Sequence, residues 1–437
     1  DIKIIIMKIC MIGTGYVGLV SGACFADLGN TVWCVDKNVK KINMLNDNKI
    51  PIYEPGLQEV VTKNHKSGRL KFTTNLKKAV QDSELIFICV GTPTSKNGSA
   101  DLKYVFAAAS EISKYINSFK VIINKSTVPV STGDKVEQII SKKNKKNKFV
   151  VISNPEFLRE GEAIRDFRFP DRIVVGSNDK KVIKKIRYLY QPLISKGAVF
   201  FSTNRRGAEI IKYASNAFLA TKISFINEIA NLCEKTNVDV EDVALGIGLD
   251  KRIGPRFLRV GPAYGGSCFP KDTQAIVYSG NKFKTNLSII KSVIKSNNNR
   301  RSLLTKRAQT ILSNKIKNKV ITFLGVTFKA NTDDMRGSTS LFMIPYFSKK
   351  GAKIRYYDPT GLKEEFRRYK NVIFCKNISK ACENADLIII HTEWDEFKSL
   401  NFNKLSKRKN IKIFDLRNLY SPSQVNKGKT KYYSIGR

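Results

Sequence analysis

Short apolar runs alternate with longer segments that carry apolar residues at helical spacing, and the alternation begins near residue 8. Residues 8–12 form an apolar run, residues 17–28 repeat apolar side chains every three or four positions, and residues 31–35 form a second run. Unbroken apolar runs of this length are typical of strands buried on both faces, and strands that alternate with helices form parallel sheets. The N-terminal part of the chain is therefore predicted to be a doubly wound α/β domain.

Three further apolar runs, at residues 84–90, 120–124 and 149–153, each lead into a polar loop. These loops are residues 91–94 (GTPT), 125–129 (KSTVP) and 154–160 (NPEFLRE). Ligands of open parallel sheets bind at the carboxyl ends of the strands, so all three loops are expected to line a cofactor or substrate site. If the last loop is helical, Glu156 and Glu160 share one face of it.

The pattern becomes helical in the middle of the chain. Residues 207–236 form a long helical pattern without an internal proline, and thirty helical residues span about 45 Å. A second helical segment covers residues 287–312. Lys212 and Asn216 lie one turn apart on one face of the long helix, and a solvated helix surface is the alternative interpretation of this pair.

A second α/β unit begins near residue 319, with apolar runs at 320–326, 353–357, 387–390 and 411–414. It lacks a G-x-G-x-x-G pattern, so a second dinucleotide is not expected there. Lys329, Arg336 and Arg417 follow strand ends, where cations could hold a nucleotide diphosphate; chance placement of three of the 77 basic residues is the alternative. His391 also ends a strand and is interpreted as structural.

The predicted fold is α/β, with two Rossmann-like doubly wound domains joined by a helical middle domain that contains a long central helix. The expected domains are residues 7–203, 204–314 and 315–437.

The first strand runs into a complete G-x-G-x-x-G motif formed by Gly13, Gly15 and Gly18. These glycines make a tight turn and let backbone amides approach a pyrophosphate at a helix N-terminus. Asp36 ends the second strand, where a carboxylate accepts hydrogen bonds from a ribose and repels a 2′-phosphate. The motif therefore predicts NAD rather than NADP, and Lys41 either reaches the same ribose or is a solvated lysine.

Residues 264–273 (YGGSCFPKDT) place one cysteine, Cys268, after two glycines and before a lysine and a carboxylate. If a helix begins at Pro270, Asp272 in its first turn points back toward the thiol. Nearby cations and helix N-termini favour the reactive thiolate. The alternative is a buried cysteine that packs as a small hydrophobe.

Composition limits the possible classes of protein. With 437 residues the chain is too long for one core, and no apolar run approaches the roughly 18 residues of a membrane span. Its start has no cleavage signal, and Met7 is interpreted as the natural initiator that follows a six-residue extension. Eight dispersed cysteines and two histidines indicate a reducing cytoplasm, no disulfide framework and no metal site.

The net charge of +40 raises the question of a polyanionic partner. Nucleic acid and an anionic membrane are the functional interpretations. Apart from residues 141–148, however, the basic residues are dispersed along the chain. We therefore favour a lysine-rich solvated surface, with neither nucleic acid nor membrane as a partner.

The motifs taken together resemble a known family. In order along the chain they are Gly13-Thr-Gly-Tyr-Val-Gly-Leu, Asp36, Pro51-Ile-Tyr-Glu-Pro-Gly-Leu, Lys125-Ser-Thr-Val-Pro, Asn154-Pro-Glu-Phe-Leu-Arg-Glu, Gly265-Gly-Ser-Cys-Phe-Pro-Lys-Asp-Thr and Phe328-Lys329. From about Met7 to the C-terminus the chain is similar to the UDP-glucose/GDP-mannose dehydrogenases. The Arg252-Ile-Gly segment before the cysteine is most similar to the members that oxidise UDP-glucose.

The resemblance implies oxidation of UDP-glucose to UDP-glucuronate by two NAD⁺ and water, through a thiohemiacetal and a thioester on Cys268. Thr127 and Asp272 would hold the water that acts as base in the first step, with Lys212 nearby. Lys212 and Asn216 would stabilise the oxyanion, and Glu156 would activate the hydrolytic water. The same chemistry on GDP-mannose or UDP-N-acetylmannosamine is the alternative, and a basic nucleotide- or nucleic-acid-binding protein without turnover is a third hypothesis.

The resemblance also implies a cofactor site, a substrate site and a homodimer or higher homo-oligomer. The cofactor site would comprise Gly13, Gly15, Tyr16, Val17, Gly18, Asp36, Lys41, Thr92, Thr127, Glu160 and Arg336. The substrate site would comprise Glu156, Phe157, Leu158, Arg159, Glu160, Lys212, Asn216, Phe257, Tyr264, Gly265, Lys329 and Arg417, with Arg252 reaching the site of a neighbouring subunit. The sequence departs from the family at Ala263, where glycine is usual, and at Gly337, where an acidic residue is common.

Overall fold

The computed structural model describes residues 6–405, 411–425 and 430–437. The chain divides into two compact units: residues up to Ser215 with Tyr278–Phe283, and Asn216–Val277 with the residues from Lys284 onward. Of the six-residue extension proposed from the sequence, residues 1–5 lie outside the described residues. Ile6 is exposed and Met7 is buried.

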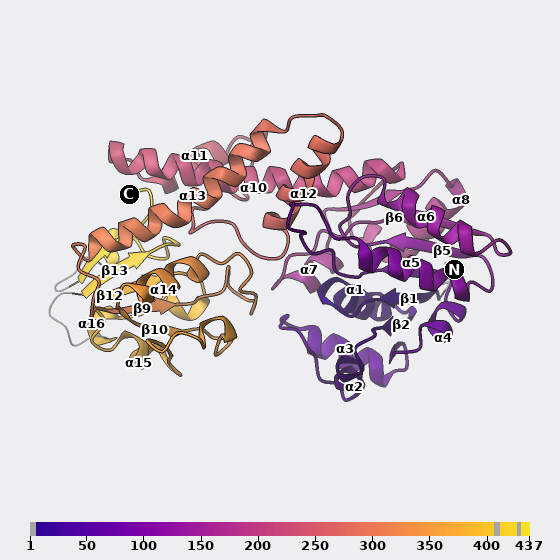
Figure 1. Ribbon diagram of the computed structural model, residues 1–437, viewed down its shortest axis with the longest axis horizontal. Helices are drawn as coiled ribbons and strands as arrows, with labels where there is room; N and C mark the ends of the chain where they lie inside the picture. Colours follow the sequence, from indigo (N-terminus) through magenta and orange to yellow (C-terminus); the bar gives the residue numbers. More distant parts are fainter. Residues whose placement is uncertain (1–5, 406–410, 426–429) are drawn as a thin grey trace. The chain divides into compact units, whose positions relative to one another are not determined.

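The first unit contains an eight-stranded sheet with the strand order β3-β2-β1-β4-β5-β6-β7-β8 (Figure 1). Its strands are β1 (Lys8–Ile12), β2 (Thr31–Val35), β3 (Leu70–Thr73), β4 (Leu85–Ile88), β5 (Lys120–Asn124), β6 (Phe149–Ser153), β7 (Arg172–Gly176) and β8 (Val199–Thr203). Neighbouring strands are parallel except β6 and β7. The order reverses between β1 and β4, which is the doubly wound arrangement.

Both faces of this sheet are covered by helices because its strands are apolar on both sides. Ile9 and Met11 of β1 pack in one apolar cluster, while Cys10 and Ile12 pack in another. The first cluster includes side chains of α1 (Tyr16–Asp27), α2 (Val39–Asn46), α3 (Leu57–Lys66), α7 (Ala163–Arg168), α8 (Lys180–Leu189) and α9 (Gln191–Ile194). The second includes α4 (Leu76–Gln81), α5 (Lys103–Tyr115) and α6 (Thr132–Lys143).

The long helix predicted from the sequence is α10 (Arg205–Thr236), which has 32 residues. It is followed by α11 (Val240–Gly248), α12 (Phe269–Lys282) and α13 (Ser288–Ile311). In the second unit, Ile226 and Ala230 of α10 share an apolar cluster with Leu304 and Ala308 of α13. The C-terminal half of α10 and the helix α13 thus pack against each other (Figure 1).

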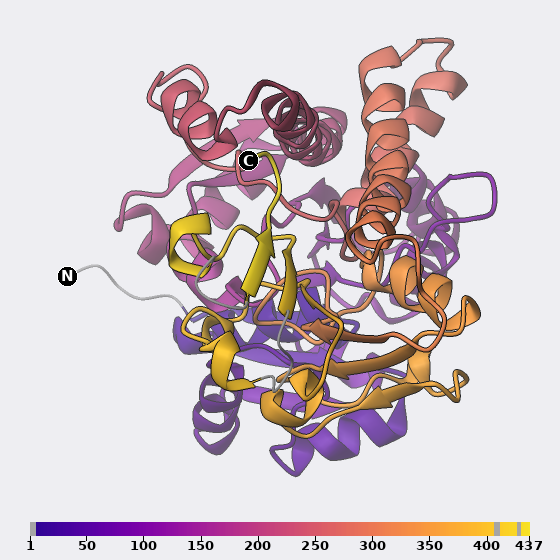
Figure 2. The same ribbon diagram turned by 90° about the vertical axis from the view of Figure 1, so that its left-hand side faces the viewer.

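The second unit contains a six-stranded parallel sheet with the order β11-β10-β9-β12-β13-β14. Its strands are β9 (Val320–Leu324), β10 (Lys353–Tyr357), β11 (Val372–Phe374), β12 (Leu387–Ile390), β13 (Ile411–Asp415) and β14 (Thr430–Tyr433), drawn in orange to yellow in Figure 2. The helices of this part are α14 (Ser340–Lys349), α15 (Ile378–Cys382), α16 (Phe402–Leu405) and α17 (Pro422–Val425). This order repeats that of the first sheet, so the two Rossmann-like sheets expected from the sequence are confirmed.

Residues 154–160 follow β6 as the loop expected from the sequence, and residues 154–159 have no regular secondary structure. Asn154 continues from β6 and donates its amide to Asn124 O at 2.9 Å. The Glu156 carboxylate then accepts the Leu158 amide at 2.6 Å. Local side-chain to backbone bonds of this kind compete with helix formation, and Glu156 and Glu160 therefore do not share a helical face.

Candidate active site

The three glycines of the G-x-G-x-x-G motif each meet a different steric demand in the turn between β1 and α1. Gly13 has φ +97°, which favours glycine, and Gly18 lies so close to Gly13 that a Cβ would stand 1.9 Å from the Gly13 carbonyl oxygen. A Cβ at Gly15, by contrast, would meet nothing within 4 Å. The turn therefore leaves open space at Gly15, at the N-terminus of α1, where a pyrophosphate would approach.

Asp36 follows β2, and its carboxylate lies against the glycine turn. It accepts hydrogen bonds from the Thr14 amide (2.9 Å), the Thr14 hydroxyl (2.7 Å) and the Asn38 amide (3.0 Å), and Lys41 Nζ lies 3.5 Å away. Burial alone would raise the pKa of Asp36, but these hydrogen bonds and the Lys41 charge hold it below its usual value. A charged carboxylate next to the turn fits the ribose of NAD.

Tyr16 joins the glycine turn to the loop after β6. Its hydroxyl donates to the buried carboxylate of Glu54, and Gly161 N donates to the same carboxylate at 2.6 Å. Ala163 N donates to the second Glu54 oxygen at 2.8 Å. Burial and the Glu54 charge raise the pKa of Tyr16 well above its usual value, so Tyr16 remains a donor, and Val17 is half-buried in the first turn of α1.

The loop after β5 is held from three sides. The Thr92 hydroxyl donates to Thr127 O at 3.0 Å, and the Ser126 hydroxyl donates to Val90 O at 2.7 Å. The Glu209 carboxylate of α10 accepts the amides of Ser131 (2.7 Å) and Gly133 (2.8 Å). A small pocket beside this loop is lined by Asn124, Ser126, Thr127, Val128, Ser153, Pro155, Glu209 and Lys212.

Lys212 and Glu156 form a buried ion pair in the first unit. Lys212 Nζ lies 3.3 Å from Glu156 Oε1 and 5.0 Å from the centroid of the Phe157 ring. Both charged side chains are almost fully buried. The interpretation of Lys212 as part of a solvated helix surface is therefore wrong, since the first half of α10 turns this side chain inward. Leu158 and Glu160 are half-buried, and Arg159 is exposed with an ion pair to Asp166.

Cys268 stands at the N-terminus of α12 in the second unit. Its carbonyl accepts the Asp272 amide at 2.8 Å, so Cys268 is the residue that opens the helix. None of the eight cysteines forms a disulfide, and Cys268 alone is not buried. The N-terminal end of a helix stabilises a thiolate, whereas burial raises the pKa of Cys24, Cys89 and Cys382 to about 12.

Asp272 lies in the first turn of α12, as expected, and is completely buried. Its carboxylate accepts Asn216 Nδ2 at 2.6 Å and pairs with Lys271 Nζ. Asn216 is also buried, so the solvated-surface interpretation is wrong for this residue too. The structure thus brings Asp272 and Asn216 together in one buried polar cluster.

The two glycines before Cys268 pack against the loop after β9. A Cβ on Gly266 would stand 2.7 Å from the Phe328 ring, and one on Gly265 would stand 2.8 Å from Gly337 O. Gly266 N donates to Arg336 O at 2.7 Å. Gly337 itself has φ +65° and lies against Gly265, so an acidic residue there would be strained and crowded. This packing is a physical reason for the departure at Gly337.

The segment before these glycines is anchored to α13. Tyr264 is buried, its amide donates to Asn297 Oδ1 at 2.8 Å, and its ring makes an edge contact with Phe269. Phe257, with φ +66°, also lies edge-on to the Phe269 ring. Ala263, the other departure, is half-buried.

Four of the cations proposed to bind ligands lie in the second unit, and they differ in their surroundings. Arg417 donates to Phe328 O at 2.6 Å and lies 2.9 Å from Glu393, while Lys329 is half-buried in the same loop as Phe328. Arg336 is exposed and paired with Asp334. Arg252 is almost fully exposed, and its guanidinium pairs with Asp250. Only Arg417 is thus closely enclosed by the fold.

Sequence reasoning gave no role to three buried groups in the first unit: Glu54, Lys125 and Glu209. Burial lowers the pKa of Lys125 to about 8, and its ammonium lies 3.3 Å from Asn154 Oδ1. Glu54 and Lys125 belong to motifs quoted above, and Glu209 precedes Lys212 by three residues on one helix face, which is the signal that could have identified it. His391 is buried as expected of a structural residue, and burial lowers its pKa to about 3.

The described part of the chain contains neither a candidate membrane span nor a candidate metal site. None of its helices has both the length and the hydrophobicity of a membrane span. Within the same residues, no group of three or more His, Cys, Asp and Glu side chains is arranged to hold a metal ion.

Comparison with known proteins gives the same family along the whole chain. Family models match in order: the NAD binding domain of the UDP-glucose/GDP-mannose dehydrogenase family over residues 7–194, its central domain over residues 206–299 and its UDP binding domain over residues 322–422. UDP-glucose 6-dehydrogenase of Rhizobium meliloti (strain 1021) is 48% identical over 99% of this chain and 100% of its own length.

Solved structures are similar over the same extent. A UDP-glucose dehydrogenase from Pyrobaculum islandicum has a TM-score of 0.92 and 33% identity, covering 99% of this chain and 98% of that one. A UDP-D-ManNAc dehydrogenase from Pyrococcus horikoshii has a TM-score of 0.86 and 26% identity, covering 99% of both chains. The chain therefore belongs to the UDP-glucose/GDP-mannose dehydrogenase family of NAD-dependent oxidoreductases.

Proposed function

We propose that this protein oxidises UDP-glucose to UDP-glucuronate. The observation that carries the proposal is Cys268, which is the one cysteine of eight that is not buried and which opens the helix α12. The 48% identical relative from Rhizobium meliloti (strain 1021) is named a UDP-glucose 6-dehydrogenase. GDP-mannose and UDP-N-acetylmannosamine are the alternative substrates.

Bound NAD⁺ supplies the oxidising power by accepting a hydride from the sugar C6. The turn at Gly13, Gly15 and Gly18 would hold its pyrophosphate, and Asp36 and Lys41 its ribose. Tyr16, Val17, Thr92, Thr127, Glu160 and Arg336 complete the proposed set of cofactor residues. Space at Gly15 and a charged carboxylate at Asp36 support this assignment.

The oxidation proceeds in two stages, and each stage removes one hydride from C6. Loss of a hydride and a proton converts the C6 alcohol to an aldehyde, and a water held by Thr127 and Asp272 takes the proton. The Cys268 thiolate then adds to the aldehyde carbon, and a second hydride loss converts this thiohemiacetal to a thioester. Water cleaves the C–S bond, which releases the carboxylate and returns the thiol. Overall, four electrons pass to two NAD⁺.

Charged and polar side chains would serve the covalent stage. Lys212 and Asn216 would stabilise the oxyanions of the thiohemiacetal and of thioester hydrolysis, since fixed donors at a developing charge contribute about 3–4 kcal/mol. Glu156 would activate the hydrolytic water. The burial of all three side chains supports these roles, because electrostatic interactions strengthen away from water.

The sugar nucleotide would contact the two loops described above. Phe157, Leu158, Arg159 and Glu160 follow Glu156 in the first unit, and Phe257, Tyr264 and Gly265 precede Cys268 in the second. Lys329 and Arg417 would hold the UDP diphosphate through charge-assisted hydrogen bonds. The exposed side chain of Arg252 suits a role in the site of a neighbouring subunit.

We further propose a homodimer or higher homo-oligomer in the cytoplasm. Phe218, Phe225 and Leu232 form a stripe of exposed apolar side chains at intervals of seven residues on α10. Such a stripe suits packing against a second copy of the same helix. None of the eight cysteines forms a disulfide, which suits a reducing compartment. Residues 7–203, 204–314 and 315–437 are the proposed functional domains.

Substitution of the cysteine tests the covalent route. Cys268→Ser should retain NAD⁺ and UDP-glucose binding, measured by calorimetry, and should lose net formation of UDP-glucuronate by at least about a thousandfold. Cys89→Ser is the matched control, because Cys89 is a buried thiol outside the proposed chemistry. Wild-type glucuronate formation by the Cys268 variant would refute the route.

The substrate is tested separately with a panel of sugar nucleotides. With UDP-glucose, the proposal predicts two NADH for each sugar consumed and the highest kcat/KM of the panel. A higher kcat/KM with GDP-mannose or UDP-N-acetylmannosamine would make that compound the preferred substrate and would not change the proposed role of Cys268.

A further inference from the structure

A buried carboxylate in the second unit has no part in the chemistry proposed above. Asp358 follows β10 and is 1% exposed. Asp36 follows β2, which pairs with β1, the first strand of its sheet along the chain. Asp358 follows β10, which pairs with β9 in the same way, so the two aspartates hold equivalent positions. Unlike Asp36, it is fully enclosed by protein groups and is inaccessible to a ribose.

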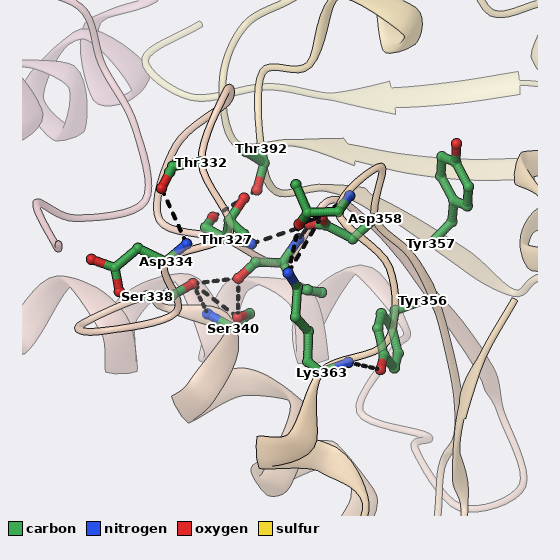
Figure 3. Close-up of polar contacts among 12 residues, drawn as sticks. Thr327, Thr332, Asp334, Ser338, Ser340, Tyr356, Tyr357, Asp358, Lys363 and Thr392 are labelled. Atoms are coloured by element: carbon green, nitrogen blue, oxygen red, sulfur yellow. Dashed lines mark hydrogen bonds and ion pairs between the residues drawn. The ribbon is translucent and has the colours of Figure 1, made fainter. Parts of the chain in front are cut away.

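Every close neighbour of the Asp358 carboxylate is a hydrogen-bond donor (Figure 3). One oxygen accepts the amides of Val326 (2.8 Å) and Thr327 (3.4 Å). The other accepts the Thr360 amide (3.0 Å) and hydroxyl (2.5 Å), and Lys363 Nζ lies 3.8 Å away. Lys363 is itself buried and donates to the Thr360 hydroxyl at 2.5 Å.

The two residues held by Asp358 have their carbonyl groups fixed as well. Val326 O accepts the hydroxyls of Ser338 (2.7 Å) and Ser340 (2.5 Å), and Thr327 O accepts the Thr392 hydroxyl (2.8 Å). All four backbone polar groups of Val326 and Thr327 are therefore bonded to side chains of the same enclosed network, and Figure 3 shows Thr327 among these side chains. Such a network fixes the path of the chain as it leaves β9.

The next residue along this fixed path is Phe328, which supports the cysteine turn. Its ring lies under Gly266, where a Cβ would stand 2.7 Å away, and its carbonyl accepts Arg417 at 2.6 Å. At the other end of the same loop, Arg336 O accepts the Gly266 amide. Gly266 precedes Cys268 by two residues, so the loop that Asp358 anchors contacts the turn that carries the thiol.

We propose that Asp358 is a positioning residue for Cys268, acting through the Val326–Phe328 segment, and that it sets the reactivity of the thiol toward the sugar aldehyde. The proposal rests on the proposed role of Cys268. Both oxygens of this side chain accept hydrogen bonds, and only a carboxylate has two acceptor oxygens. An amide at this site would turn its NH₂ group toward donors and release one side of the network.

Asp358→Asn tests the proposal, with Asp386→Asn as the matched control. Asp386 is a buried aspartate at the opposite end of β9, where it accepts the Val320 amide at 2.8 Å and pairs with Lys319 at 3.1 Å. Both variants lose one buried carboxylate that accepts a backbone amide at an end of β9: Asp386 binds the first residue of the strand, and Asp358 binds residues just after its last. Only Asp358 contacts the loop that holds the cysteine turn.

The main measurement is the rate at which iodoacetamide alkylates Cys268 in the folded full-length protein between pH 6 and pH 9, followed by peptide mass spectrometry. This measurement needs no turnover, so it remains informative even if UDP-glucose is not the substrate. In Asp358→Asn we expect alkylation at pH 7 to slow by at least about threefold and kcat to fall by about tenfold, because the thiol is no longer held at the helix N-terminus. The KM for NAD⁺ should stay within about twofold, since Asp358 lies outside the proposed cofactor residues.

Asp386→Asn should lower the melting temperature and leave the alkylation rate and kcat unchanged. Equal alkylation rates in wild type and Asp358→Asn, or equal losses in both variants, would overturn the proposal. If Asp358→Asn does not fold, Phe328→Leu provides the second test, because it shortens the support under Gly266 and leaves the buried network intact. Wild-type alkylation and kcat in that variant would likewise overturn the proposal.

Discussion

At the scale of single residues, Glu209 shows how a buried charge can serve a site without touching the chemistry. Its carboxylate accepts the amides of Ser131 and Gly133 and the Ser153 hydroxyl (3.3 Å), all near the loop that carries Thr127. Ser131 has φ +72°, an uncommon value for a residue other than glycine. Glu209 thus caps α6 from a different helix, in place of a side chain from the N-cap residue itself.

The protonation of Glu209 predicts a pH dependence of stability. Burial raises the pKa of this carboxyl to about 7, although its three hydrogen bonds oppose the shift. The unfolded chain releases this proton near pH 4.5, whereas the folded chain releases it near pH 7, so the free energy of unfolding falls as pH rises between these values. The full shift corresponds to about 3 kcal/mol.

Glu209→Gln should remove this dependence, because glutamine does not titrate. We expect the variant to lose less stability than wild type between pH 4.5 and pH 7, measured by urea unfolding at intervals of half a pH unit. Glu228→Gln on the exposed side of α10 is the control and should follow the wild-type curve. Parallel curves for wild type and Glu209→Gln would show that Glu209 does not titrate in this range.

At the scale of elements, the sequence predicts well those structures that depend on local patterns. The strands β1, β2, β5 and β6 and the helix α10 follow from apolar runs and helical spacing, and the glycine turn follows from its motif. The loop at residues 154–160 was expected too, but its path was not, because it depends on the hydrogen bond from the Leu158 amide to the Glu156 carboxylate, which no local pattern shows. Glu209 was also missed as an anchor, since its partners lie up to 78 residues away.

The glycine turn between β1 and α1 allows the effects of two substitutions to be separated. Gly18→Ala would place a Cβ 1.9 Å from Gly13 O and should destabilise the first unit by several kcal/mol, on the order of an overpacked core. Gly15→Ala meets nothing within 4 Å and has extended backbone angles that alanine adopts freely. It should keep the melting temperature of wild type.

Gly15→Ala should weaken NAD⁺ binding without affecting stability, because the new methyl group fills the space where the pyrophosphate approaches. We expect its affinity for NAD⁺ to fall by at least about tenfold, measured by calorimetry. Wild-type NAD⁺ affinity combined with a wild-type melting temperature would show that the pyrophosphate lies elsewhere.

At the scale of the whole molecule, the exposed apolar side chains and the net charge of +40 both affect self-association. The charge is dispersed and opposes self-association by repulsion. Even so, Phe218, Phe225 and Leu232 leave apolar surface exposed along α10, and Leu245 on α11 and Leu249 just after it do the same. Exposed apolar groups at heptad spacing on a protein of this charge favour an interface between copies.

Introducing negative charge into the stripe tests the proposed interface directly. If the proposed homo-oligomer forms through this stripe, Phe225→Glu with Leu232→Glu should convert it to a monomer, as measured by light scattering and sedimentation velocity, because two carboxylates per chain would have to be buried without partners. Ile373→Glu is the control, since Ile373 is a similarly exposed apolar residue on β11, away from α10. If Arg252 acts in the site of a neighbouring subunit, the monomer should also lose kcat, and NAD⁺ binding should be retained. An unchanged oligomeric mass in the double variant would place the interface on another surface, and a wild type that is itself monomeric would remove it altogether.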